Sequence, residues 1–338
     1  MSGALVISLD FEKHWGVIDR PLGGPYMGNL LGVPGSVLGT LALFRDFQVA
    51  ATWATVGFLF ARSREEREQF APALRPQYAD AALDSYVVPT GSDEESDPVH
   101  YGASLIEAIV STPLQEISTH TFSHFFCLEQ GVAAKDAFRA DLASACAIMQ
   151  HTVGMTPRSI VFPGNQHNPD FDDVLLKSGI TCYRGSPRSW MWSPRPRGES
   201  LLVRASRLID AYVPLGGMHT VPWSAVPEPS GLCNVAASFF LRPYSAGARL
   251  RRLRAALRHA ARAGEILHLW WHPHNFGTDT ETHLNVLREL LVEFDRCRDE
   301  FGMQSLTMSD AAMAARARAA PGIDLTRPAP PVRTSSVS

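Results

Sequence analysis

Short apolar runs alternate along the chain with longer segments whose apolar residues recur every three or four positions. The short runs predict buried strands, and the longer segments predict helices that cover them. The predicted strands are 4–10, 49–60, 114–119, 158–163, 180–185, 265–272 and 303–308. The predicted helices are 34–47, 104–112, 134–154, 169–179, 247–264 and 281–302. Because strands that alternate with helices form parallel sheets, this order predicts an α/β fold, either an open sheet or a barrel.

Three stretches interrupt the alternation. Residues 84–102 are polar and acidic, which predicts a surface loop, and residues 185–231 are rich in Trp, Pro and Gly, which predicts long loops. The last residues, 318–338, have the composition of a disordered tail. The sequence therefore predicts one domain over residues 1–317, followed by this tail.

The composition excludes several kinds of partner. The chain has 338 residues, 45% of them hydrophobic, and a formal net charge of -3, so we expect a large core, no nucleic-acid partner and no membrane insertion. The first predicted strand begins at Ala4, which leaves no room for a secretory signal. The five cysteines are scattered and form no C-x-x-C pair. We therefore expect reduced thiols and a cytoplasmic protein.

Ionisable residues gather directly after three of the predicted strands. The sequence SLDFEKH places Asp10, Glu12 and His14 at alternate positions, which share one face of a strand. The sequence HTFSH places His120 and His124 four residues apart, a spacing at which two imidazoles can bind one metal ion. Functional sites of α/β folds gather where parallel strands have their carboxyl ends, so we expect these groups to meet.

The third cluster, HLWWHPHNFG, contains His268, His272 and His274. Strand alternation predicts that they share a face, with His272 nearest the carboxyl end of the strand. Each cluster alone has a simpler explanation, such as solvated charges or, for His272, a core histidine bonded to a backbone carbonyl. Three strand ends that each supply His or a carboxylate are hard to explain by packing, so together they predict a shared site.

These motifs resemble those of the polysaccharide deacetylase superfamily, the metal-dependent amidohydrolases related to chitin and nodulation-factor deacetylases. SLDFE resembles the first motif in a variant with an Asp-x-acid arrangement, HTFSH resembles the second motif, H-[ST]-x-x-H, and WWHPH stands where the family has its late catalytic histidine. The resemblance covers roughly residues 4–310 and implies a distorted (β/α) barrel of about seven parallel strands. The motif pattern resembles a branch of the superfamily found in surface-carbohydrate biosynthesis more than it resembles secreted chitin-type enzymes.

The resemblance also implies a role for each residue. Glu12, His120 and His124 would bind a divalent metal ion, with Zn²⁺ favoured by a His and carboxylate ligand set. Asp10 would be the general base, and His272 would be the general acid that protonates the departing amine. The inverted assignment, in which Asp10 is the ligand and Glu12 lies outside the metal shell, stays open.

The sequence departs from the family pattern in its third motif, which usually carries an Arg. The chain reads VFPGNQHN there, with Asn165 and Gln166 in place of the charge. Both are candidates to bind substrate hydroxyls or the acyl oxygen, or else to cap the helix near Pro169. His274 and Asn275 are candidates to shape the substrate pocket. No Asp-Trp pair that would tune the late histidine is evident.

Tryptophans are candidates to stack on a sugar ring, although aromatic residues in α/β domains more often fill the core. These candidates are Trp190, Trp192, Trp223 and Trp271. The arginines of helix 247–264 alternate with leucines at helical spacing and are expected to form a solvated face.

We therefore expect a hydrolase that removes an N-acetyl or N-formyl group from an amino sugar or sugar derivative by metal-activated water. An alternative is a hydrolase of another small linear amide or cyclic imide, as in allantoinase-like relatives. A third is a carbohydrate-binding protein without activity. The loops 84–100 and 186–231 are long enough to fold over the site, which favours a small-molecule amino sugar over a cell-wall polymer.

Overall fold

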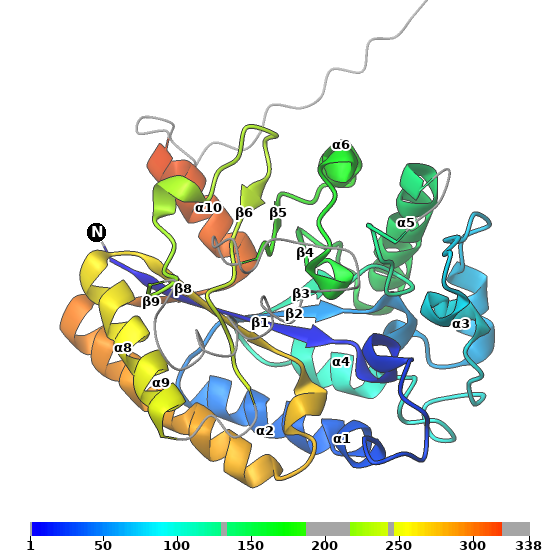
Figure 1. Ribbon diagram of the computed structural model, residues 1–338, viewed down its shortest axis with the longest axis horizontal. Coiled ribbons are helices and arrows are strands. Elements are labelled where there is room, and N and C mark those ends of the chain that lie inside the picture. The colour runs from blue at the N-terminus through cyan, green and yellow to red at the C-terminus, as the bar shows by residue number, and fades with distance from the viewer. Residues whose placement is uncertain (1, 130–133, 187–216, 243–246, 320–338) are drawn as a thin grey trace, which may run out of the picture.

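A computed structural model of the protein describes residues 2–129, 134–186, 217–242 and 247–319 (Figure 1). Its strands are β1 (Ala4–Phe11), β2 (Ala51–Thr55), β3 (Gln115–Thr119), β4 (Ser159–Ile160), β5 (Cys182–Tyr183), β6 (Cys233–Asn234), β7 (Phe239–Phe240), β8 (Ile266–Trp271) and β9 (Gln304–Leu306). Its α-helices are α1 (Met27–Leu31), α2 (Val33–Asp46), α3 (Arg64–Phe70), α4 (Ala103–Val110), α5 (Ala134–Val153), α6 (Asp172–Lys177), α8 (Ala248–Ala263), α9 (Thr280–Phe301) and α10 (Met308–Ala319).

The strands form one sheet in which all described pairings between strands are parallel, which confirms the predicted α/β class. The order is β6-β5-β4-β3-β2-β1-β8-β7, and β9 pairs with the amino-terminal half of β1. The described sheet has nine strands, more than the seven or so predicted. The two additional strands, β6 and β7, have two residues each, too few for a hydrophobic pattern to reveal.

The sheet curls into a distorted barrel whose two edges meet at residues 233–241. The first half of this segment bonds to the β5 edge, where the Val235 N–H donates to the Tyr183 carbonyl (2.9 Å). The second half bonds to β8, where the Ser238 N–H donates to the His268 carbonyl (2.8 Å). One extended segment therefore bridges the edges of the sheet, as the predicted (β/α) barrel requires.

The core follows from the alternation along β1, whose eight residues are all buried. Leu5, Ile7 and Leu9 face outward and join a large apolar cluster beneath the surrounding helices. Ala4 and Val6 face inward and join a second cluster inside the barrel. Figure 1 shows α8 and α9 side by side on one flank of the sheet, with α5 and α6 on the opposite flank. Burial on both faces explains why β1 reads as a continuous apolar run.

The predicted surface loop, residues 84–102, is irregular apart from a short 3-10 turn and is anchored beside the end of β1. The His14 N–H donates to the Val99 carbonyl (3.2 Å), and Trp15 Nε1 donates to the His100 carbonyl (2.9 Å). The loop therefore lies beside the residues that follow Glu12. None of the described helices combines the length and apolarity needed to cross a membrane.

The predicted tail begins later than expected because α10 continues to Ala319. Residues 320–338 lie outside the described residues, as do 187–216, which include the stacking candidates Trp190 and Trp192.

A buried polar cluster fastens α10 to the amino-terminal end of the barrel. Glu116, in β3, accepts hydrogen bonds from Thr52 Oγ1 of β2 (2.7 Å) and from Ser159 Oγ of β4 (2.7 Å). It also accepts from the backbone N–H of Ser309 in the first turn of α10 (3.3 Å). A carboxylate is favourable at a helix N-terminus, so one side chain joins three strands to the helix.

We expect Glu116→Ala to lower the free energy of unfolding by about 1–3 kcal/mol, because it leaves several partly buried donors without an acceptor. Reversible urea unfolding followed by circular dichroism measures the loss. The matched control is Asp136→Ala, an exposed carboxylate in the first turn of α5, which should leave the unfolding midpoint nearly unchanged. Equal effects of the two substitutions would contradict this role for Glu116.

Candidate active site

β1 delivers two carboxylates to the carboxyl end of the barrel. Asp10 faces the interior, Glu12 lies just beyond the strand, and they are 3% and 4% exposed. The alternation stops there because Lys13 has a φ of 49°. His14 consequently turns away, and its Nδ1 lies 2.8 Å from His100 Nε2. The expected direction shared by three ionisable groups therefore holds for the two carboxylates and fails for His14.

One oxygen of Glu12 contacts both histidines of the second motif. Glu12 Oε2 lies 3.2 Å from His120 Nε2 and 3.1 Å from His124 Nε2. His120 Nδ1 lies 2.7 Å from the Val161 carbonyl oxygen, which can only accept, so this nitrogen carries the proton. The other nitrogen, Nε2, therefore faces the Glu12 oxygen and is the one available to a proton or a metal ion. Two acceptors at this distance need a proton or a cation between them.

The electrostatics of this group favour cation binding. Burial alone would raise the pKa of Glu12, but the charge of His272 and the hydrogen bonds of His120 and His124 bring that pKa well below its usual value. Burial lowers the pKa of His124, which favours its neutral, ligating form. These groups lie close enough together to hold one metal ion. The carboxylate and two imidazoles form a ligand set suited to Zn²⁺.

Asp10 is held by an arginine that the sequence analysis did not single out. Arg184 follows β5, and its Nη1 and Nη2 donate to the two oxygens of Asp10 at 2.6 and 2.7 Å. Burial would raise the pKa of Asp10, but the charge and hydrogen bonds of Arg184 outweigh it and keep the pKa below its usual value. A charged residue at the carboxyl end of the predicted strand 180–185 was the signal that could have revealed Arg184.

Arg184 is in turn held by neutral groups inside the barrel. Its Nη1 donates to Ser8 Oγ (3.0 Å), and Ser8 Oγ lies 2.9 Å from His268 Nε2. The other nitrogen of His268 donates to the Val235 carbonyl (2.8 Å), and burial lowers the pKa of this histidine to about 3. His268 is therefore neutral, and it accepts the Ser8 hydroxyl proton. Like His272, it lies on the inner face, as the alternation predicted, but below the site.

His272 lies across the site from the second motif. Its Nε2 is 3.4 Å from Glu12 Oε1 and 3.7 Å from Asp10 Oδ2, and its side chain is 23% exposed. Its Nδ1 lies 3.1 Å from the Asn275 side-chain oxygen. The Asn275 amide nitrogen donates to Tyr26 Oη (3.2 Å). Asn275 thus orients His272 so that Nε2 faces both carboxylates.

His274 stacks on His272, with ring centroids 4.9 Å apart and an interplanar angle of 11°. It is buried, and burial together with the charge of His272 lowers its pKa to about 3. Glu12, His272 and His274 also lie close enough to be a second possible ligand set, which shares the Glu12 carboxylate with the first.

The two substrate-binding candidates after β4 make contacts within the protein. Asn165 accepts a hydrogen bond from Arg184 Nη2 (2.9 Å), so its side-chain oxygen is engaged by the arginine that binds Asp10. Gln166 is 5% exposed, and its side-chain oxygen accepts from the Leu128 N–H (3.0 Å). Neither caps the following helix, because Asn168 does so through the N–H of residue 170.

The structure corrects the choice of tryptophan. Trp271 is 0% exposed and stacks on Phe276 in the core, so it has no surface to offer a sugar. Alternation along β8 directs Trp270 inward, where its ring lies 4.1 Å from the Arg184 guanidinium and 5.5 Å from the His272 ring. Trp270 was missed, although the strand alternation that places His268 and His272 on the inner face also places Trp270 there.

Trp223 is not part of this site either. It is 7% exposed and belongs to the inner cluster packed against α10, at the opposite end of the barrel.

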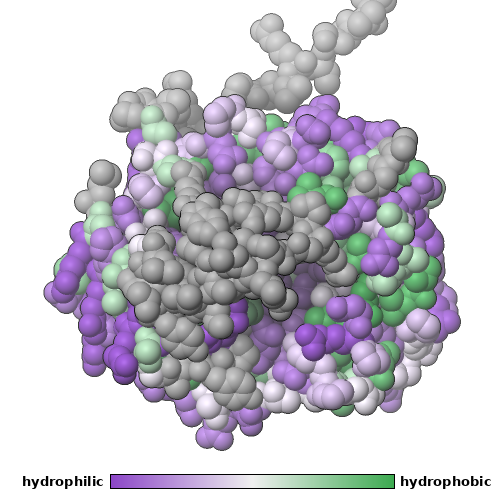
Figure 2. Space-filling view, in the orientation of Figure 1, coloured by the Kyte–Doolittle hydropathy of each residue, from purple (hydrophilic) through white to green (hydrophobic). Residues whose placement is uncertain are grey.

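Figure 2 shows that polar side chains predominate on the described surface of the face that it draws.

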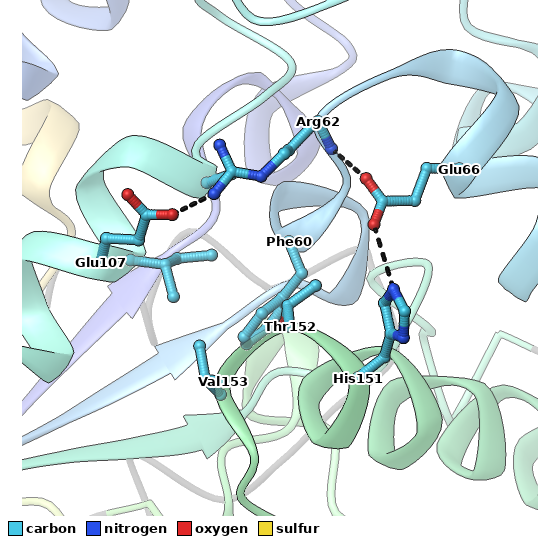
Figure 3. Close-up of a pocket in the computed structure, with 9 residues that line it drawn as sticks. Phe60, Arg62, Glu66, Glu107, His151, Thr152 and Val153 are labelled. Atoms are coloured by element: carbon cyan, nitrogen blue, oxygen red, sulfur yellow. Dashed lines mark hydrogen bonds and ion pairs between the residues drawn. The ribbon is translucent and has the colours of Figure 1, made fainter.

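A separate small pocket lies between α4, α5 and the turn after β2 (Figure 3). It has a volume of about 210 Å³ and contains none of the residues described above. The Arg62 guanidinium there is paired with Glu107, and its backbone N–H donates to Glu66 (2.7 Å). Glu66 also faces His151 at 3.9 Å, so the charges in this pocket are satisfied internally.

Comparison with solved structures defines the fold. The chain is similar to a protein described as a polysaccharide deacetylase from Mycobacterium smegmatis, with a TM-score of 0.57, 16% identity, and coverage of 97% of this chain and 96% of that one. It is also similar to one described as a polysaccharide deacetylase from Pseudomonas aeruginosa PAO1, with a TM-score of 0.54, 12% identity, and coverage of 94% and 91%. The fold is thus one found in structures bearing the polysaccharide deacetylase name.

The same fold occurs in the allantoinase Puue, with a TM-score of 0.54, 11% identity, and coverage of 95% of this chain and 91% of that one. The sequence matches no family model and no curated protein. The comparisons therefore establish the barrel, and its chemistry has to be argued from the residues at its carboxyl end.

A glycine makes room for the Glu12 carboxylate. A Cβ added at Gly16 would overlap the carboxylate atoms of Glu12. We expect Gly16→Ala to displace this group from His120 and His124 and to weaken Zn²⁺ binding about tenfold or more. Equilibrium dialysis followed by metal analysis measures the affinity.

The matched control is Gly35→Ala in α2, where an added Cβ would meet nothing within 4 Å. This variant should bind Zn²⁺ as the unaltered chain does. Unchanged binding in a folded Gly16→Ala variant would contradict the contact with Glu12.

Proposed function

We propose that the protein is a metal-dependent hydrolase that removes an N-acyl group, acetyl or formyl, from a small amino sugar or sugar derivative. The observation that carries this proposal is the contact of one Glu12 oxygen with both His120 and His124, beside the buried Asp10 and the partly exposed His272. Metal ligands, a base and an acid are the groups that metal-assisted amide hydrolysis requires. The fold shared with structures named polysaccharide deacetylase supports the same class.

Glu12, His120 and His124 would hold the metal ion. The convergence of His120 Nε2 and His124 Nε2 on one Glu12 oxygen supports this assignment, because a cation between them can accept lone pairs from all three atoms. When bound, a divalent ion such as Zn²⁺ supplies Lewis-acid polarisation of the acyl carbonyl and makes a coordinated water more acidic. The inverted assignment is disfavoured, since both oxygens of Asp10 are already engaged by Arg184.

Asp10 would accept the proton of the attacking water. Arg184 keeps this carboxylate ionised and fixes its orientation, which is what a general base requires at neutral pH. His272 would donate a proton to the departing amine nitrogen as the carbon–nitrogen bond breaks, since an unprotonated amine anion is a very poor leaving group. Asn275 holds the His272 ring with Nε2 toward the carboxylates. The products are a carboxylate and a free amine.

The substrate would contact the open side of this group. Trp270 and Phe240 are both partly exposed, and their rings lie 4.6 Å apart beside His272. An aromatic pair of this kind suits the apolar face of a sugar ring. His274 and Asn275 would bound the pocket on the other side of His272. A cytoplasmic location and a short ligand stay predictions of the sequence.

The second candidate function is hydrolysis of another small linear amide or a cyclic imide. The equal TM-score of 0.54 to the allantoinase and to the second deacetylase-named structure favours keeping it. Its chemistry would use the same base, acid and metal ligands. A carbohydrate-binding protein without activity has no need of all three, so this third possibility is not favoured.

Mass spectrometry of the metal-loaded protein tests the function. The panel holds N-acetyl and N-formyl amino sugars, their nucleotide-linked forms, N-acetyl-glucosamine oligomers of increasing length, and allantoin. We expect loss of an acyl group from monomeric sugars, and Asp10→Asn should lower this rate about 10²-fold or more while it keeps the metal. Turnover of allantoin alone would replace the leading function by the second. Efficiency that rises steadily with oligomer length would overturn the small substrate.

The acid role of His272 has a separate signature. We expect His272→Ala to slow hydrolysis of an unactivated amide far more than hydrolysis of an activated aryl ester, whose leaving group needs no proton. Steady-state kinetics of both substrates measure the two losses. Equal losses would assign His272 to binding instead of proton donation.

A further inference from the structure

The second motif adopts a backbone conformation that non-glycine residues rarely take. Thr121 has a φ of 64° and His124 a φ of 59°, so both lie in the left-handed region. Left-handed residues other than glycine cost conformational energy and persist where surrounding contacts over-determine them. The segment 120–124 therefore needs contacts that hold it in place.

The β2 side supplies one set of contacts. The Gly57 N–H donates to the Thr121 carbonyl (2.8 Å), and the Phe58 N–H donates to the Phe122 carbonyl (3.0 Å). A Cβ added at Gly57 would overlap Phe122, so the two backbones approach as closely as glycine allows. These bonds satisfy carbonyl groups of the segment. The His120 N–H donates to the Thr55 carbonyl (2.9 Å) and the Thr121 N–H to Thr119 Oγ1 (3.0 Å), which leaves the N–H groups of Phe122 and Ser123 to be satisfied from the other side.

Asp141, in α5, supplies the other set. Its Oδ1 accepts from the Phe122 N–H (2.7 Å), and its Oδ2 accepts from the Ser123 N–H (3.1 Å) and from the Ser123 hydroxyl. Asp141 is 0% exposed and has no described ion-pair partner. Burial raises its pKa to about 6 in spite of these hydrogen bonds. A buried carboxylate without a counter-charge is costly, which points to a function beyond packing.

We propose that Asp141 is a positioning residue for the metal site, because it fixes the turn between His120 and His124 so that both Nε2 atoms face Glu12. This inference rests on the proposed function. A carboxylate is the smallest group that can accept from two successive backbone N–H groups and a hydroxyl together. An Asn in its place would turn its NH₂ group toward one of these N–H or O–H donors, where an acceptor is needed. An alkyl side chain would leave all three donors buried without an acceptor.

The test compares Asp141→Asn with Leu142→Ala, a cavity-forming change at the next residue of the same helix, where Leu142 is also 0% exposed. The Zn²⁺ dissociation constant is measured by competition with a chromophoric chelator, and the thermal midpoint is measured on the same samples. We expect Asp141→Asn to weaken Zn²⁺ binding about 10–100-fold. Leu142→Ala should lower the thermal midpoint at least as much and keep the unaltered affinity. Asp136→Asn, an exposed charge on α5, should change neither quantity.

Unaltered affinity in a folded Asp141→Asn variant, or an equal loss of affinity in Leu142→Ala, would overturn the positioning role while leaving the proposed function intact. An unaltered chain that binds no Zn²⁺ would overturn the proposed function, and the positioning role with it. If Asp141→Asn does not fold, Ser123→Ala replaces it. That variant removes only the hydroxyl bond, and we expect it to weaken binding about threefold by the same reasoning. Unchanged binding there would also overturn the inference.

Discussion

Two carboxylates are buried next to each other at the end of one strand, and the surrounding structure compensates for their charge. In a low-dielectric interior, Asp10 and Glu12 would take up protons unless positive charge or hydrogen-bond donors lie beside them. Arg184 gives Asp10 a permanent counter-charge. Glu12 faces imidazoles instead, whose protons can be exchanged for a metal ion. The two carboxylates therefore differ in kind: Asp10 has a fixed partner, and Glu12 has exchangeable ones, which is the difference on which the proposed roles of base and metal ligand rest.

The ion pair between Asp10 and Arg184 connects several strands at the site. Arg184 comes from β5, contacts Ser8 and Asp10 of β1, and lies over Trp270 of β8. Removing one partner of a buried ion pair costs about 3–5 kcal/mol. The contacts that orient Asp10 are therefore also contacts that hold the barrel together. Substitutions here have to be judged by activity and by stability on the same samples.

The parallel α/β sheet and the meeting of three strand ends could be predicted because both follow from periodicity, whereas the barrel was implied by the resemblance of the motifs. β6 and β7 could not be predicted, because a strand of two residues is too short to show a repeating pattern of hydrophobic positions. His14 was misplaced because the positive φ of Lys13 ends the alternation. Trp271 was chosen where strand alternation points to Trp270. Asp141 gave no local signal, because its contacts lie across the fold and its helix is amphipathic without it.

Arg184 reaches Asp10 from a different strand than the one after which the resemblance places an arginine. The resemblance places an arginine after the fourth predicted strand, where this chain has Asn165. β4 and β5 are neighbours in the sheet, and the Arg184 N–H bonds to the Ile160 carbonyl (3.2 Å), so the two strand ends lie side by side. A long guanidinium side chain reaches Asp10 from β5 and donates to Asn165 on the way. The order of motifs along the sequence can therefore differ while a positive charge still lies beside Asp10, because neighbouring strand ends of the barrel reach the same place. The barrel itself constrains the sequence less than its rim does, since the chain keeps the fold over 97% of its length at 16% identity to a solved structure.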